Sequence, residues 1–181
     1  IENMGILAIA TVVGGLGMYA GILHLIGHSF SKAAFFLTSG NILTMFRSKK
    51  VKSAIGILKI ENKTAWLFVA CCLAIIATPP SLLFMSEFLL LKQMFINKQF
   101  ILAILLLLLL TIIIFGITQT VFKMVFSDGQ SEKLEIAIQN KSKVKFSMLI
   151  SQIILLAIVF LLGIYIPDIL NNLIKISIGG F

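Results

Sequence analysis

Long apolar runs, separated by short polar segments, dominate the pattern of this chain. Six of these runs predict membrane helices, because about 20 apolar residues span the hydrocarbon core of a bilayer. They cover residues 4–19, which is short for a span, and 21–46, 65–78, 81–97, 100–126 and 146–166. The sequence therefore predicts an all-α, polytopic transmembrane helix bundle with about six membrane helices, forming a single membrane domain over residues 1–181.

The segments between the runs are polar. Residues 47–63 form a basic loop, within which residues 51–58 are expected to form a short surface helix. Residues 127–145 are expected to form a loop of mixed charge, and residues 168–181 an amphipathic tail.

Pro79 and Pro80 interrupt the apolar pattern between two runs. Proline lacks a backbone N–H and clashes with the preceding helical turn, so the first helix must end near Thr78. Broken helices at membrane depth line cavities, where the freed backbone groups find partners. We therefore predict one broken helix at Pro79-Pro80.

Composition supports a membrane protein and excludes a soluble domain. The chain is 59% hydrophobic and 12% charged, whereas soluble domains carry about 25% charged residues. Its mean hydropathy is +1.09. Most of the excess behind the net charge of +8 lies between apolar runs, which is typical of membrane topology. We therefore expect the lipid bilayer as a partner and no nucleic acid.

The basic residues are divided between the two sides of the predicted bundle. One side is assigned six residues from 47–63 together with Lys92, Lys98 and Lys175. The other side is assigned Lys133, Lys141, Lys143 and Lys145. This contrast is too small for the positive-inside rule to fix the orientation.

A polar stripe interrupts the run at residues 21–46. His24, His28 and Lys32 are spaced by four residues, so successive side chains lie about 40° apart on one helix face over roughly 12 Å. Ionisable groups are costly inside a membrane and mark proton or ion pathways. Desolvation disfavours the charged form of Lys32 and favours release of its proton. We predict a proton path along this stripe.

Structural alternatives remain for each member of the stripe. Lys32 could pair with a carboxylate of a neighbouring helix, and either histidine could be a satisfied core residue. His24 and His28 could share a metal ion, but two ligands do not complete a site. We therefore predict no metal site and no catalytic residue in this chain.

Glu87 follows the proline break and is the acidic residue inside the apolar runs. It either exchanges protons with a water chain or neutralises Lys32, and it completes the predicted relay. Gln119 and Lys123 are possible accessory polar positions in the run at 100–126. The adjacent Cys71 and Cys72 have no second pair to form a metal site, so we predict that they are buried.

These residues occur in a recognisable order. His24-x3-His28-x3-Lys32-x2-Phe35 and Phe36-Leu37-x2-Gly40-Asn41 are preceded by Asn3-Met4-Gly5 and followed by Pro79-Pro80-x3-Phe84-x2-Glu87-Phe88. This pattern resembles the antiporter-like proton-translocating subunits of the complex I and membrane-bound hydrogenase superfamily. With Ser86-Glu87-Phe88 and Lys123-Met124-Val125-Phe126, it is most similar to the component F branch of hydrogenase-4, which accompanies formate hydrogenlyase.

The resemblance implies a function and a setting. In this superfamily two inverted bundles form half-channels joined by buried charges, and redox centres lie in partner proteins. The chain would then be the C-terminal part of a longer subunit, containing the second half-channel bundle and the final helices, and would hold no cofactor. Its partners would be other membrane-arm subunits and a hydrophilic hydrogenase or quinone-reducing module. Its place would be the inner membrane of a prokaryote.

Two other functions fit the same residues. One is a cation/proton antiporter subunit of the Mrp type, which exchanges ions without redox chemistry. The other is a structural subunit of a membrane arm, in which Lys32 and Glu87 serve assembly. Proton exchange that depends on sodium would identify the antiporter. Mutations of Lys32 and Glu87 that lower assembly and activity in parallel, with an unchanged pumping ratio, would identify the structural subunit.

Overall fold

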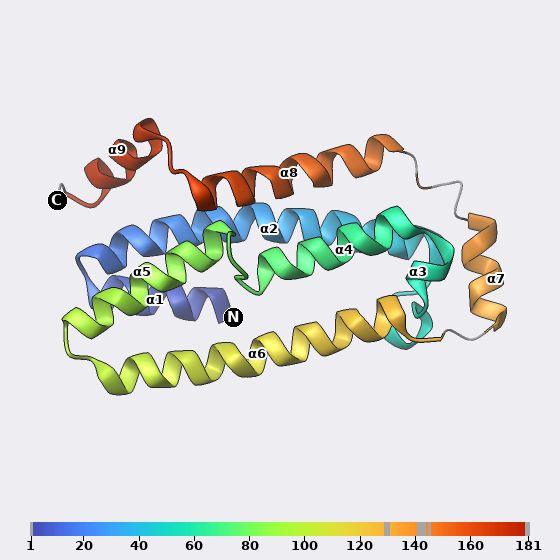
Figure 1. The fold of residues 1–181 in the computed structure, drawn as a ribbon, viewed down its shortest axis with the longest axis horizontal. Helices are drawn as coiled ribbons and strands as arrows, with labels where there is room; N and C mark the ends of the chain where they lie inside the picture. Colours follow the sequence, from blue (N-terminus) through green and yellow to red (C-terminus); the bar gives the residue numbers. More distant parts are fainter. Residues whose placement is uncertain (1, 129–130, 141–143, 145, 180–181) are drawn as a thin grey trace.

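The computed structural model describes residues 2–128, 131–140, 144 and 146–179. Within these ranges all regular secondary structure is helical (Figure 1). The elements are α1 (Glu2–Val13), α2 (Leu16–Phe46), the 3-10 turn η1 (Val51–Ser53), α3 (Ile57–Ile60), α4 (Asn62–Ile75), α5 (Leu82–Ile96), α6 (Phe100–Phe126), α7 (Ser131–Asn140), α8 (Phe146–Ile164) and α9 (Asp168–Ser177). The all-α prediction is therefore confirmed.

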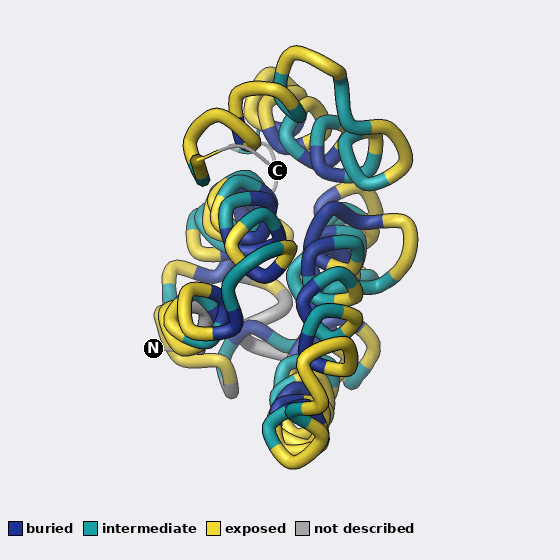
Figure 2. Tube along the Cα trace, turned by 90° about the vertical axis from the view of Figure 1, so that its left-hand side faces the viewer, coloured by how far each residue is buried: buried dark blue, intermediate teal, exposed yellow. Residues whose placement is uncertain are grey.

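Helix α2 is the centre of the bundle. Helices α1, α4, α5, α7 and α8 all pack against it, whereas α6 lies outside, against α4 and α5 (Figure 1). Seen from the end, buried positions face one another across the bundle and exposed positions cover its rim (Figure 2). A residue on the inner face of α2 therefore meets several other helices.

The boundary between the first two helices differs from the predicted one. Gly14 and Gly15 have φ of 69° and 53°, a backbone region that side-chain-bearing residues rarely adopt. They end α1 at Val13 and start α2 at Leu16. Residues 16–19 thus belong to the second helix, because a glycine pair can reverse the chain where hydropathy shows no change.

The predicted break at Pro79-Pro80 is confirmed. Helix α4 ends at Ile75, and α5 begins at Leu82 with the Ser81 Oγ atom accepting a hydrogen bond of 3.3 Å from Phe84 N. The two helices continue in the same overall direction across the bundle (Figure 1). Together they run from one end of the bundle to the other once.

This path corrects the predicted distribution of charge. Because the break does not reverse the chain, the turn from α5 to α6, beside which Lys92 and Lys98 occur in the sequence, and helix α9, which contains Lys175, lie at the end opposite α3, whereas α7 lies at the same end as α3 (Figure 1). Lys59 and Asp128 form an ion pair at that shared end. Of the residues assigned to the other side, Lys141, Lys143 and Lys145 lie outside the described residues. Basic residues therefore gather at one end, called the basic end below.

Both predicted loops contain structure that the sequence pattern did not indicate. A single surface helix at 51–58 is wrong: Gly56, with φ of 84°, separates η1 from α3, and Ile57 is buried. The loop at 127–145 contains α7, which docks through buried Ala137 and through Asn140, whose Nδ2 atom donates to Met45 O at 3.5 Å. Tertiary contacts thus stabilise these short helices.

The described helices differ in length and hydropathy. Two of the described helices, α6 and α8, are long and apolar enough to cross a membrane, and the apolar helices Met4–Val13 and Asn62–Ile75 are shorter. The figure of about six membrane helices remains a prediction. The predicted amphipathic tail forms α9, with Ile174 buried and Ile169 and Ile176 exposed.

Candidate functional site

His24 and His28 lie on one face of α2, as the four-residue spacing predicts. Their rings are stacked with centroids 6.2 Å apart and planes inclined by 2°. His24 is 2% exposed and His28 is half-buried. The face that carries them packs against α5, so the stripe meets the second half of the broken helix.

Ser86 connects this stripe to α5. The His24 Nδ1 atom lies 3.1 Å from Ser86 Oγ, and the Ser86 hydroxyl donates to Leu83 O at 2.7 Å. A serine hydroxyl carries a single proton, so in this arrangement His24 Nδ1–H is the donor to Ser86 Oγ. The sequence analysis missed Ser86, although it precedes Glu87, because a serine in a helix gives no signal of a cross-helix contact.

Two further polar groups on α2 are buried near this contact. His28 Nδ1 and Ser31 Oγ have no hydrogen-bond partner among the described residues. Buried polar atoms without partners cost about 1–3 kcal/mol each, so they usually bind water or serve a function. The inner face of α2 therefore has polar atoms that can contact water beside the stacked rings.

Lys32 lies one helical turn beyond His28 and is partly buried. Its Nζ atom is 5.5 Å from the centroid of the Phe36 ring, within the range of a cation–π contact. Glu87, also partly buried, is next to Ser86 on α5. The structure thus places the three members of the stripe on consecutive turns of α2, and Glu87 beside the serine that His24 contacts.

A second buried polar cluster joins α2, α4 and α8, and the sequence analysis missed it. The Thr38 hydroxyl carries one proton, which can be donated to Ala34 O at 2.8 Å or to Gln152 Oε1 at 3.1 Å, and its oxygen lies 3.4 Å from Cys71 Sγ. Asn41 Nδ2 donates to the same Gln152 oxygen at 3.3 Å. An amide within the apolar run at 146–166 was the available signal, since such a group needs a partner in a membrane.

The helix break is held between α2 and α8. A Cβ atom on Gly163 of α8 would lie 2.0 Å from Pro80 O, and one on Gly27 of α2 would lie 3.2 Å from Leu82. At Gly163 the neighbouring atom is backbone, so only glycine fits there, whereas at Gly27 the neighbour is the Leu82 side chain. Gly163 therefore fixes the position of the break, and with it the start of α5, which carries Ser86 and Glu87.

The other predicted residues lie elsewhere. Gln119 and Lys123 are exposed on α6, and an accessory role for them remains a prediction. Cys71 and Cys72 are buried as predicted. Among the described residues, no three His, Cys, Asp or Glu side chains come close enough to hold a metal ion.

Sequence comparisons cover the region of the stripe and the break. The family described as NADH:quinone oxidoreductase/Mrp antiporter, TM, matches residues 1–114. This segment contains His24, His28, Lys32 and Glu87, whereas Gln152 lies beyond it. The match thus covers the first polar cluster and one side of the second.

Relatives of three kinds share parts of the sequence. A hydrogenase-4 component F homolog of Methylacidiphilum infernorum is 40% identical over 96 residues, which are 52% of this chain and 20% of that protein. NADH-quinone oxidoreductase subunit N of Desulforudis audaxviator is 30% identical over 91 residues, 50% of this chain and 18% of that protein. Na(+)/H(+) antiporter subunit A1 of Staphylococcus aureus is 30% identical over 161 residues, 84% of this chain and 20% of that protein.

The chain spans about a fifth of the length of these relatives. All three are named as subunits or components of larger assemblies, and the family description specifies a transmembrane segment. With a family match over more than half of its length and a helical bundle built around a polar stripe, this membrane protein belongs to the NADH:quinone oxidoreductase/Mrp antiporter transmembrane family.

Proposed function

We propose that this chain is part of a proton-translocating membrane subunit of a hydrogenase-4 or formate hydrogenlyase complex, or of a related quinone-reducing complex. Protons move through Lys32, His28, His24 and Glu87. The redox reaction takes place in a hydrophilic partner module, and other membrane-arm subunits adjoin this one. The 40% identity with a hydrogenase-4 component F homolog supports the hydrogenase type.

The contact between His24 and Ser86 carries this proposal. It joins the ionisable face of α2 to the helix that carries Glu87, at a position 2% exposed for the histidine and 1% for the serine. A buried imidazole with an ordered partner on one nitrogen is suited to pass a proton between its two nitrogens. The arrangement therefore supplies a link between two helices in the interior of the bundle.

Water completes the relay in this proposal. The rings of the two histidines are stacked with centroids 6.2 Å apart, whereas proton transfer requires two heavy atoms about 3 Å apart or a water between them. Buried His28 Nδ1, which has no protein partner among the described residues, is suited to bind such a water. A shift of α5 at the break would move Ser86 relative to His24 and open or close the path.

The proposed setting is a prokaryotic inner membrane crossed several times by the bundle. Basic residues are enriched on the cytoplasmic side of membrane proteins. The basic end, with six Lys and Arg residues between positions 47 and 63, would therefore face the cytoplasm. With this orientation, the C-terminal end of α2 would lie on the cytoplasmic side of the membrane.

The test uses the complete complex in inverted membrane vesicles, with proton uptake measured beside the rate of electron transfer. We expect Lys32→Met and Glu87→Gln each to abolish coupled proton uptake, because each removes an ionisable group from the relay, while the complex still assembles. Lys92→Met is the matched control: it neutralises an exposed lysine on α5 and should keep the pumping ratio of the wild type.

Ser86→Ala tests the geometry itself. It removes the acceptor of His24 Nδ1–H and should lower proton uptake about tenfold, equivalent to about 1.4 kcal/mol. Ser29→Ala is its control, since the exposed Ser29 hydroxyl bonds Leu25 O of its own helix. A normal pumping ratio in Lys32→Met or Glu87→Gln would exclude that residue from the relay. Parallel loss of assembly and activity, with an unchanged ratio, would support a structural role.

Cation exchange is the second function we consider, because the similarity to the Na(+)/H(+) antiporter subunit A1 extends over 84% of this chain. In that case the same buried groups would exchange protons for sodium without a redox module. Proton uptake that requires sodium and persists without hydrogenase or quinone chemistry would favour this function.

A further inference from the structure

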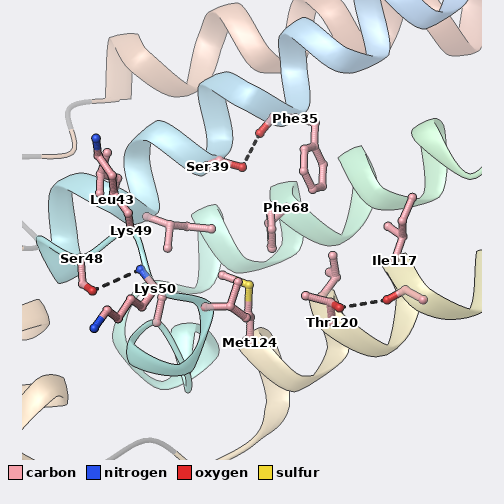
Figure 3. A pocket seen from close by; sticks show the side chains of 15 residues that line it. Phe35, Ser39, Leu43, Ser48, Lys49, Lys50, Phe68, Ile117, Thr120 and Met124 are labelled. Atoms are coloured by element: carbon pink, nitrogen blue, oxygen red, sulfur yellow. Dashed lines mark hydrogen bonds between the residues drawn. The ribbon is translucent and has the colours of Figure 1, made fainter. Parts of the chain in front are cut away.

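A groove opens between α2, α4 and α6 at the basic end of the bundle. Its volume is about 490 Å³, and its walls include Phe35 of α2, Phe68 of α4 and Ile117 of α6 (Figure 3). Lys49 and Lys50, which follow the end of α2, lie at one end of the groove (Figure 3). None of the residues of the proposed proton path lines it.

The interior of the groove suits a hydrocarbon. Its hydroxyl groups are already bonded to their own helices: Ser39 donates to Phe35 O at 2.8 Å and Thr120 to Gly116 O at 2.9 Å. These groups therefore demand no polar partner from an occupant. Gly116 leaves the floor open, because a Cβ atom there would meet nothing within 4 Å.

The groove extends over most of one leaflet of a bilayer. On α2 its lining runs from Phe35 to Leu43, which is eight residue steps, or about 12 Å at 1.5 Å per residue. Half of a hydrocarbon core is about 15 Å. Trp66, 59% exposed near the start of α4, lies at the same end, as expected for a side chain at the membrane surface.

Two lysines at the opening of the groove can attract an anionic group. Lys49 and Lys50 are both exposed, and Ser48 Oγ accepts a hydrogen bond of 3.3 Å from Lys50 N, which shapes the turn that carries them. Clustered lysines beside a membrane helix attract anionic lipid headgroups. The groove is therefore apolar along one leaflet and positive at the membrane surface.

We propose that this groove binds one acyl chain of an anionic phospholipid, with its phosphate held at Lys49 and Lys50. The apolar walls and the two exposed lysines at the opening favour a lipid, because an acyl chain joined to a phosphate has its apolar and anionic parts in the same order. The lipid fills the space between α2 and α6 and stabilises the packing of the outer helix.

The test measures phospholipid binding to the full-length subunit by native mass spectrometry in detergent, with phosphatidylglycerol and phosphatidylcholine as probes. Gly116→Phe should abolish the binding of both lipids at this site, because the ring fills the groove. Gly116→Ala, which leaves most of the space open, should bind both as the wild type does. Equal binding by Gly116→Phe and Gly116→Ala would overturn the proposal.

The charge is tested separately. Lys49→Gln/Lys50→Gln should weaken phosphatidylglycerol binding about thirtyfold, since each lysine near a membrane surface contributes roughly a factor of five, and should leave phosphatidylcholine binding unchanged. Lys92→Gln/Lys98→Gln, near the opposite end, is the matched control. An unchanged preference for phosphatidylglycerol in the Lys49/Lys50 variant would overturn the role of the two lysines. A photoreactive residue at Ile117 should crosslink to lipid, and a crosslink to a peptide would show that protein fills the groove.

Discussion

The hydrogen-bonded polar side chains on the inner face of α2 and on the outer helix α6 have partners of different kinds. On α2, His24 contacts Ser86 of α5, Asn41 donates to Gln152 of α8, and the Thr38 oxygen lies 3.1 Å from the same Gln152 oxygen. On α6, Thr111 and Thr120 donate to carbonyl oxygens of their own helix. The first kind of bond joins two helices, whereas the second lies within one helix.

The two kinds of hydrogen bond have different consequences for a helix in a membrane. A hydroxyl that bonds its own backbone can face lipid without leaving a polar group unsatisfied. A side chain that bonds another helix fixes the register of the two helices, so its loss affects both. We therefore expect substitutions on the face of α2 and its partners to be costly, and equivalent substitutions on α6 to be tolerated.

The largest effect is expected at the glycine that holds the helix break. Gly163→Ala should destabilise the protein by about 3 kcal/mol or more, because the added Cβ would lie 2.0 Å from Pro80 O and the backbone must move. The yield of folded protein and its thermal midpoint in detergent measure this loss. Gly116→Ala, on α6, has open space around the new atom and should leave the midpoint unchanged or slightly higher. Equal midpoints for the two variants would remove the distinction between the regions.

Loss of the shared acceptor on α8 is expected to cost less. Gln152→Leu leaves Asn41 Nδ2 without its cross-helix acceptor, at about 1–3 kcal/mol, whereas the Thr38 hydroxyl keeps Ala34 O as an acceptor. Chemical unfolding of the purified protein measures it. The triple variant Thr38→Val/Asn41→Leu/Gln152→Leu should recover most of the loss, because no unpaired donor remains.

Thr120→Val on α6 is the control for that prediction. The threonine is exposed and bonded to its own helix, so the change should stay within about 0.5 kcal/mol. A triple variant no more stable than Gln152→Leu would show that shape, and not hydrogen bonding, determines the stability of the cluster.

Much of the fold could be predicted where hydropathy changes sharply. The run at 100–126 has the bounds of α6, and the break at Pro79-Pro80 follows from the chemistry of proline. The start of α2 could not be predicted, since positive φ at Gly14 and Gly15 leaves no trace in hydropathy. Helix α7 was missed because its contacts with α2 and α3, and not its own sequence, hold it.

The site was predictable only along a single helix. The stripe of His24, His28 and Lys32 follows from helical spacing, and the stacked rings confirm that geometry. The partners Ser86 and Gln152 could not be identified, because which residues meet across helices depends on packing distances that no local pattern contains. The role of Gly163 could not be predicted either, because it depends on the close approach of Pro80, which only the structure shows.

The smallest effect is expected at the end of α6, where Asp128 pairs with Lys59. The hydrogen bond from Lys59 lowers the pKa of the Asp128 carboxyl below its usual value. The pair therefore contributes stability above the unfolded-state pKa of about 3.9, and this contribution is lost as the pH falls through the lowered folded pKa. Both side chains are largely exposed, at 62% and 86%, so solvent screens the pair. The thermal midpoints of wild type and Asp128→Asn should therefore agree within error at pH 7. They should also agree at a pH below the lowered pKa of Asp128, where the protonated carboxyl no longer pairs with Lys59. A clear loss in Asp128→Asn at neutral pH, reproduced by Lys59→Gln, would show that this end of α6 is fixed as firmly as the inner face of α2.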